Sequence, residues 1–267
     1  MMTYSEHLSF RQSATPINEP VSKLGGQPCW LDAPCWPISR ELGKPMTFIG
    51  QIRIEGPLFG NPQPFRMAYL FMTDVEDGEG GDLQTYDPNA GENAVVIQPG
   101  NYPGPARPLA TGPTVEVNTL SFNALPGTQL PGQPVEPVWS LDELTAQAEA
   151  HRALYPFEPL DPASGKEFAI VAQRVEEHPY VGEAERYAEQ LSAEEMAEMD
   201  QIAQSWEGTK IGGSPAWTQY EQFPFDDWLL LFQAAEDRLP VAVNFGTGVV
   251  YCFVNKELSV GKMLWQC

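Results

Sequence analysis

A nine-residue pattern that occurs twice is the feature of this sequence that most restricts its fold. Ser22-Lys-Leu-Gly-Gly-Gln-Pro-Cys-Trp30 and Thr209-Lys-Ile-Gly-Gly-Ser-Pro-Ala-Trp217 share a hydroxyl, a Lys, an aliphatic residue, a Gly pair, a Pro and a Trp in the same order. The downstream spacing also agrees, because a Gln in one apolar segment stands 20 residues before a Phe in the next: Gln51 and Phe71, and Gln233 and Phe253. A shared pattern with shared spacing predicts two related, duplicated segments.

Most of the remaining apolar sequence is typical of strands. Short segments rich in β-branched and aromatic residues alternate with clusters of Gly, Pro, Asn and Asp, which favours strands joined by turns. Most connections are too short to contain a crossover helix, so antiparallel pairing is expected. The predicted strands are 46–54, 66–73, 94–98, 114–118, 168–175, 228–233, 249–254 and 262–266.

The acidic residues are concentrated in the middle of the chain. The 267 residues include 36 acidic and 15 basic ones, a net charge of -21, and residues 131–207 hold 17 of the acids. Two capping boxes in this region, Ser140–Glu143 and Ser192–Glu195, predict helices that end near residues 154 and 206. The fold class that follows is α+β, with mostly antiparallel sheets in two internally duplicated β-rich halves. We expect a single domain over 1–267, with a first repeat half (20–130), an acidic helical insert (131–207) and a second repeat half (208–267).

The two repeat motifs and their flanking residues resemble a known family. The first motif continues into Cys35-Trp-Pro and Lys44-Pro-Met-Thr-Phe-Ile-Gly-Gln-Ile, and this opening is similar to that of the YwqG-like family of uncharacterised bacterial proteins. The closing stretch resembles the same family in Lys210–Pro215, Leu229–Gln233, Gly246–Tyr251 and Leu264–Cys267. The resemblance covers residues 22–73 and 208–267 well. It implies an α+β, internally duplicated fold and no established activity, and relatives that often lie among toxin–immunity genes.

The sequence carries no recognisable catalytic, metal or cofactor motif. His7, His151 and His178 have neither the spacing of a metal site nor a neighbouring nucleophile motif, and no phosphate-binding loop occurs. Cys29 and Cys35 are not spaced as zinc ligands. We therefore expect no catalytic residue, metal or cofactor, and we expect His7 to lie in a mobile N-terminal segment. With no signal peptide or membrane helix in the pattern, the predicted location is the cytoplasm.

The net charge points to a protein partner of opposite sign. A strongly negative surface disfavours nucleic acid and anionic membranes and accelerates encounter with a basic surface. The first hypothesis is therefore a non-enzymatic binding protein that neutralises a basic partner, such as a bacterial toxin, with Tyr180 or Tyr187 as an aromatic anchor. The predicted partner-binding acids are Asp74, Glu76, Asp77, Glu79, Asp82, Glu194, Glu195, Glu198 and Asp200. The Asp74–Asp82 run could also gather a hard cation such as calcium, although a solvated hairpin loop is favoured.

A second hypothesis is a small-ligand-binding or enzymatic module with an anionic ligand between the two halves. Its candidate residues are Lys23, Gln51, Lys210 and Gln233, which correspond across the repeat. A structural corner is the favoured interpretation of the motif, since the Gly pair permits close approach of the backbone and the Trp provides an apolar anchor. Lysines that line a concave pocket would favour the ligand-binding hypothesis. A third hypothesis is a scaffold subunit with Trp30, Trp36 and Trp217 in an apolar patch, although core positions are favoured for these residues.

Overall fold

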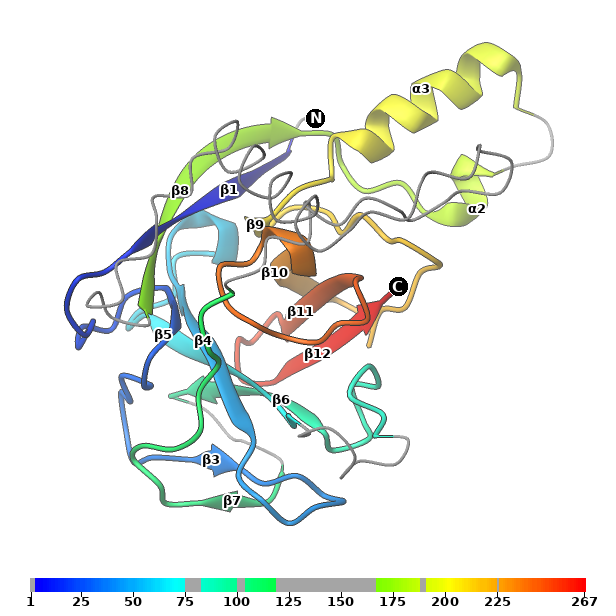
Figure 1. Ribbon diagram of the computed structural model, residues 1–267. Coiled ribbons are helices and arrows are strands. Elements are labelled where there is room, and N and C mark those ends of the chain that lie inside the picture. Colours follow the sequence, from blue (N-terminus) through cyan, green and yellow to red (C-terminus); the bar gives the residue numbers. More distant parts are fainter. Residues whose placement is uncertain (1–2, 75–82, 100–103, 119–166, 188–190, 225) are drawn as a thin grey trace, which may run out of the picture.

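Ten antiparallel strands form a closed barrel in the computed structural model of the protein (Figure 1). The structure describes residues 3–74, 83–99, 104–118, 167–187, 191–224 and 226–267. Around the barrel the strand order is β1-β8-β2-β4-β5-β6-β12-β11-β10-β9. The strands are β1 (Thr3–Gln12), β2 (Lys23–Gly25), β4 (Thr47–Ile54), β5 (Arg66–Met72), β6 (Asn93–Gln98), β8 (Glu167–Glu177), β9 (Lys210–Ile211), β10 (Trp228–Ala235), β11 (Val249–Asn255) and β12 (Gly261–Gln266).

Smaller elements lie outside the barrel. A two-stranded sheet pairs β3 (Trp36–Pro37) with β7 (Ala106–Arg107). The helical elements are η1 (Pro57–Phe59), α2 (Glu183–Arg186), α3 (Ala193–Gln204) and η3 (Glu236–Arg238). Helix α3 projects away from the barrel (Figure 1), and none of its residues is buried. Within the described ranges, no helix has both the length and the apolar character needed to cross a membrane.

The predicted α+β fold with two separate halves is wrong, because strands from all three predicted regions share the one barrel. Strand β8 belongs to the predicted helical insert, yet it pairs along its length with β1 and also with β2. Strand β9, from the predicted second half, pairs with β1 at the N-terminus. Periodicity along the sequence identifies strands but does not say which distant strands become neighbours.

Most individual elements were nonetheless predicted correctly. The strands expected at 46–54, 66–73, 94–98, 168–175, 228–233, 249–254 and 262–266 are confirmed. Residues 114–118 form only isolated bridges, Phe48 with Thr114 and Val117 with Val241. The capping box that begins α3 is confirmed, since the Ser192 hydroxyl accepts from the Glu195 amide and the Glu195 carboxylate accepts from the Ser192 amide. The box at Ser140–Glu143 lies outside the described residues.

The N-terminal segment was predicted to be mobile and instead forms β1. Its residues pair with β8 at every position from Thr3 to Gln12. Leu8 and Phe10 pack against the main core, so the alternating apolar residues of this segment have a buried face.

The core fills the barrel, and two further clusters cover its outer surface. Along β5, Ala68 and Leu70 belong to the internal core, whereas Tyr69 and Phe71 point to the outer side, as expected for alternating strand positions. Trp36 is fully buried in the outer cluster over β4–β6, with Trp30 packed against it. Trp217 covers the corresponding cluster over β10–β12. These tryptophans therefore anchor loops to the sheet instead of forming an exposed patch.

Candidate functional site

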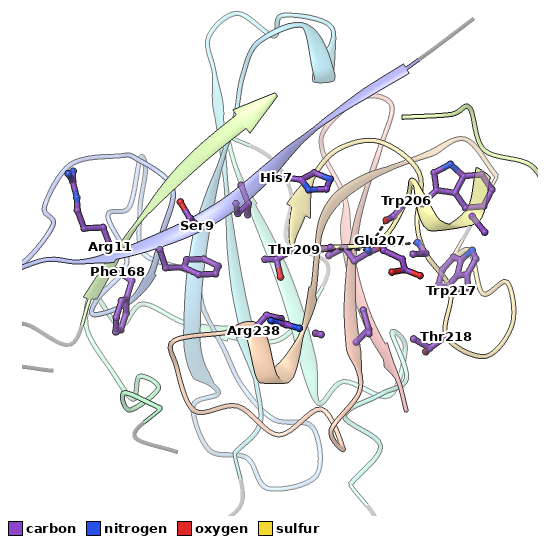
Figure 2. Close-up of a pocket in the computed structure, with 18 of the residues that line it drawn as sticks. His7, Ser9, Arg11, Phe168, Trp206, Glu207, Thr209, Trp217, Thr218 and Arg238 are labelled. Carbon is purple, nitrogen blue, oxygen red and sulfur yellow. Dashed lines mark hydrogen bonds between the residues drawn. The ribbon is translucent and has the colours of Figure 1, made fainter. Parts of the chain in front are cut away.

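A cavity of about 950 Å³ lies between β1 and β10 (Figure 2). One wall is the second half of β1, from His7 to Gln12, together with Phe168 at the start of β8. The opposite wall includes Gln233 and Ala235 of β10 and Arg238 of η3. Trp206, Glu207 and Trp217 border it on a third side. A volume of this size is at the upper end of the range for small-molecule sites.

The cavity exists because β9, which joins β1 to β10, is only two residues long. Strand β9 pairs with only two residues of β1, Glu6 and His7. The next residue of β1, Leu8, donates its amide to the Thr209 carbonyl at 2.9 Å. Immediately before Thr209, Gly208 has a φ of +110° and the chain turns away from the barrel toward Trp206. A side chain at Gly208 would approach the His7 ring to 3.2 Å, so glycine suits this turn on both counts. Beyond Leu8, the described residues place no strand beside β1 on this side.

Cationic side chains gather at this cavity although the protein is strongly acidic. Three of the nine arginines in the sequence, Arg11, Arg186 and Arg238, line it, against the single carboxylate of Glu207. The Arg186 guanidinium lies 5.5 Å from the Trp206 ring centre, and its Nε is buried without a partner in the described structure. The side chain of Arg238 is 61% exposed, with its guanidinium 3.8 Å from the neighbouring Asp237. These groups are therefore available to an anion.

His7 adds a titratable group to the wall. Its Nε2 is buried and has no hydrogen-bond partner among the described residues. Burial lowers the pKa of His7, and the nearby Lys210 lowers it further, while Glu177 acts in the opposite direction. The imidazole is therefore biased toward its neutral form until a negative charge comes close.

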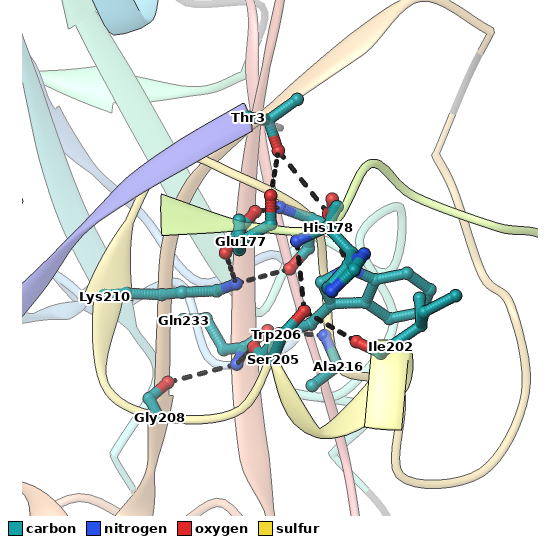
Figure 3. A network of polar contacts seen from close by, with 11 residues as sticks. Thr3, Glu177, His178, Ile202, Ser205, Trp206, Gly208, Lys210, Ala216 and Gln233 are labelled. Carbon is teal, nitrogen blue, oxygen red and sulfur yellow. Dashed lines mark hydrogen bonds and ion pairs between the residues drawn. The ribbon is translucent and has the colours of Figure 1, made fainter. Parts of the chain in front are cut away.

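Next to the cavity lies the second corner, which we define as residues 209–217 together with Glu177 (Figure 3). The Lys210 ammonium lies 2.8 Å from Glu177 Oε2 and donates to the Ser214 carbonyl at 2.6 Å. Both charged side chains are completely buried. Burial lowers the pKa of Lys210, and the hydrogen bond that its ammonium donates to Glu177 offsets part of that effect.

The first corner, residues 22–30 together with Glu167, has a matching ion pair, although its lysine donates to the Ile17 carbonyl upstream of the motif. Its Lys23 ammonium lies 3.2 Å from Glu167 Oε2. Gly26 and Gly213 have φ values of +66° and +75°, and a Cβ on either would lie within 2.1 Å of the facing glutamate oxygen. A side chain larger than hydrogen is therefore excluded at both positions, which explains the second Gly of each motif.

The glutamines and a following tyrosine hold each motif in matching ways. Gln51 Oε1 accepts from the Cys29 amide, and Gln233 Oε1 accepts from the Ala216 amide, both at 2.8 Å. The Tyr69 and Tyr251 hydroxyls donate to the carbonyls of the same two residues, at 2.8 and 2.6 Å. The motif tryptophan then packs 4.6 Å from the tyrosine ring in both corners.

The four ligand candidates of the repeat thus hold the corners. Lys23 and Lys210 are buried in ion pairs and neither borders the cavity, and Gln51 is buried as well. Gln233 lines the cavity, but its amide nitrogen donates to the Trp206 and Gly208 carbonyls. The residues that surround the cavity and that sequence reasoning missed are His7, Arg186 and Arg238. The alternation of apolar residues in 3–12 was a signal for the strand that carries His7.

The predicted partner-binding acids are only partly described. Asp74 is exposed, whereas Glu76, Asp77, Glu79 and Asp82 lie outside the described residues. The acids of α3 are all exposed: Glu194, Glu195, Glu198 and Asp200. The two hydrogen bonds from Ser192 lower the pKa of Glu195. Of the proposed aromatic anchors, Tyr187 is 73% exposed, but Tyr180 donates its hydroxyl to Glu221 and packs against Trp206.

The fold and the cavity define a closed antiparallel β-barrel protein with a cationic, aromatic-walled cleft beside a buried ion pair. The chain belongs to the family described as domain of unknown function (DUF1963), which matches residues 22–259. A search of curated proteins gave no match.

Proposed function

We propose that this protein binds an anionic ligand with an apolar portion in the cavity between β1 and β10. The observation that carries the proposal is that Arg11, Arg186 and Arg238 line one concave site of a protein with a net charge of -21. Arginine forks pair with carboxylates and phosphates through two parallel hydrogen bonds. The partly exposed side chains of Phe10 and Trp217 border the same cavity and suit the apolar portion of such a ligand.

Ligand binding without catalysis is the simplest activity for this site. Among the described lining residues, no Ser or Thr hydroxyl hydrogen-bonds to His7, so no activated nucleophile supports a hydrolytic reaction. We accordingly propose a binding protein rather than an enzyme. Assignment of the chain to the YwqG-like group, and a cytoplasmic location, remain predictions from the sequence.

Titration of a panel of small anions tests this function. Citrate, benzoate and inorganic phosphate would be titrated into the protein while tryptophan fluorescence is recorded, because Trp206 and Trp217 border the cavity. We expect R186Q and R238Q to weaken the binding of the best anion by about tenfold each, the loss of one charge-assisted hydrogen bond. R107Q removes the same charge from β7, away from the cavity, and is the matched control. Equal binding by all three variants would overturn the proposal.

A basic protein partner is the second candidate function, and the exposure of α3 favours it. Glu194, Glu198 and Asp200 are exposed on a helix that projects from the barrel (Figure 1), and Met196 beside them is 49% exposed. A helix that buries no residue of its own suits a contact with another protein. Such a partner would associate more slowly at high salt.

The partner can be tested by pull-down from bacterial extract at low and moderate salt. A triple E194Q/E198Q/D200N variant should lose a stoichiometric basic protein that the wild type retains. A D32N/E41Q/E257Q variant carries the same change in net charge at other exposed positions and should retain it. Equal retention by both variants would exclude α3 as the docking surface.

A further inference from the structure

We propose that the ligand of the cavity is an extended acidic peptide that adds to β1 as an extra strand in line with β9. This inference rests on the proposed function, since it specifies the chemical class of the anion. It is carried by the direction of the backbone groups of β1 and β10, and by the charges at the cavity.

The backbone groups of Phe10 on β1 face the cavity. In β8, the Ile170 amide donates to Ser22 of the neighbouring chain segment, so it faces away from β1. Ile170 pairs with Phe10, and in an antiparallel ladder such a pair directs its backbone groups away from the shared side. The Phe10 N–H and C=O therefore point toward the cavity. No described residue hydrogen-bonds to them.

On the opposite wall, the end of β10 also presents backbone groups to the cavity. The Glu236 amide donates to the Gly248 carbonyl at 2.9 Å and therefore faces β11. The backbone groups of adjacent strand residues point to opposite sides, so Ala235, directly before Glu236, directs its own away from β11. Ala235 lines the cavity, and β9 pairs with β10 only at Gln233. The cavity is thus bordered by strand edges on two sides, the arrangement that accepts an added strand.

The geometry also sets the direction and the length of the guest. Strand β9 is antiparallel to both β1 and β10, so a guest in line with it runs antiparallel to both. On β1, the exposed backbone edge is that of Phe10, and together with its neighbours Ser9 and Arg11 it spans three positions at a rise of roughly 3.4 Å each, so the pairing needs a peptide of about three residues.

Charge and side-chain alternation select the guest sequence. On β1, His7, Ser9 and Arg11 share one face, whereas Leu8 and Phe10 point toward the core. A guest strand has the same alternation, so acidic residues would lie beside Arg11 and His7 and apolar residues beside Phe10. Arg186 and Arg238 favour the same acidic class and disfavour a basic peptide.

The test uses a positional-scanning library of capped hexapeptides in which acidic and apolar residues alternate, with citrate as the free-anion probe. Binding is measured on the full-length protein by tryptophan fluorescence, and amide hydrogen exchange is then recorded with the best peptide. We expect the Phe10 amide to exchange at least about tenfold more slowly when the site is saturated, because it gains a hydrogen bond. The Ser9 amide already faces β8 and serves as the internal control. A peptide with its charges reversed should not bind.

Variants and a modified peptide complete the test. N-methylation of the guest residue opposite Phe10 should weaken binding by about tenfold, since it removes a backbone donor and adds bulk at the edge. R11Q should weaken the acidic peptide more than R107Q does. If citrate binds in an Arg238-dependent manner and no peptide binds, the proposed function stands and strand addition is overturned. Peptide binding without protection of Phe10 also overturns it, and failure of every anion overturns both proposals.

Discussion

The two corners share their ion pair and their glutamine, tyrosine and tryptophan contacts, but the chain upstream of the motif takes a different path at each, and this difference produces the cavity. In the first corner, the upstream chain folds over the ion pair: the Lys23 ammonium donates to the Ile17 carbonyl, and Glu167 accepts from the Ile17 amide. At the other corner, Ser214 of the motif itself makes both of these contacts. In the second corner, the chain before Lys210 leaves the barrel at Gly208. A buried Lys–Glu pair therefore serves as a fixed support in both places. The opening beside it depends on the path of the chain upstream.

The largest expected effect comes from removing the lysine of either corner. K210M leaves Glu177 buried without its cation and should lower the free energy of unfolding by about 3–5 kcal/mol. K23M should cost less, because the side chain of Glu167 is 9% exposed and can gain water, whereas that of Glu177 is fully buried. Urea unfolding of the two variants checks the order. A larger loss of unfolding free energy for K23M would show that burial of the ion pair does not decide which lysine contributes more to stability.

The tyrosine of each corner should contribute less than the lysine, and by similar amounts in the two corners. Burial raises the pKa of Tyr251 to about 12, so its hydroxyl stays a donor to Ala216 at neutral pH. Y251F should cost about 1–3 kcal/mol, because a carbonyl loses its buried donor. Y69F should cost about the same, because Leu31 and Thr218 hold matching positions after the motif and each hydrogen-bonds to the tyrosine hydroxyl of its corner. Thermal unfolding of the two variants measures this, and clearly unequal losses would contradict the equivalence of the two tyrosines.

Helix α3 precedes the second corner and has no counterpart at the first, so its stability should be separable from that of the barrel. S192A removes the capping hydroxyl and should lower the local opening free energy of α3 by about 1 kcal/mol. Amide hydrogen exchange should show faster exchange in α3 and unchanged exchange in β4 and β11. A parallel loss of protection in these strands would mean that α3 and the barrel open together.

The smallest expected effect is a pH dependence of stability that arises at the second corner and not at the first. Lys210 pairs with His7 on β1, whereas Lys23 pairs with Ala169 on β8, so only the second corner has a neighbouring imidazole. Burial and Lys210 hold the pKa of His7 below its ordinary value of 6.5, against the pull of Glu177. As the pH falls below about 6.5, the unfolded chain takes up a proton before the folded one, and stability falls.

The variant H7N should remove this part of the pH dependence. Denaturant midpoints at pH 7.5 and 5.5 would be compared for H7N and the wild type, with H178N as the control histidine. Binding of the acidic peptide should raise the pKa of His7 and therefore tighten as the pH falls. An unchanged difference between the two pH values in H7N would exclude His7 as the group responsible.

Sequence reasoning predicted local elements well because their causes are local. The strands near 46–54 and 249–254 are short runs rich in β-branched and aromatic residues, and the capping box at Ser192 is contained in four residues. The motif was also interpreted correctly as a structural corner in which glycine and tryptophan have defined packing roles. These features need no knowledge of distant partners.

The barrel and the cavity could not be predicted in this way, because both depend on residues far apart in the sequence. Phe10 and Ile170 are neighbours only through the pairing of β1 with β8. Arg186, Arg238 and His7 come from three separate elements, and no spacing rule joins them. The turn at Gly208, which opens the cavity, looks in the sequence like any other loop glycine.

Both corner carboxylates come from one strand, and this has a consequence for the length of β8. Glu167 and Glu177 stand at its two ends, ten positions apart, and an even separation places both side chains on the same face. Insertion or deletion of a single residue between them would turn one carboxylate to the opposite face and leave a buried lysine without its anion. Changes in length should therefore be tolerated in the loops of this family and strongly selected against within β8.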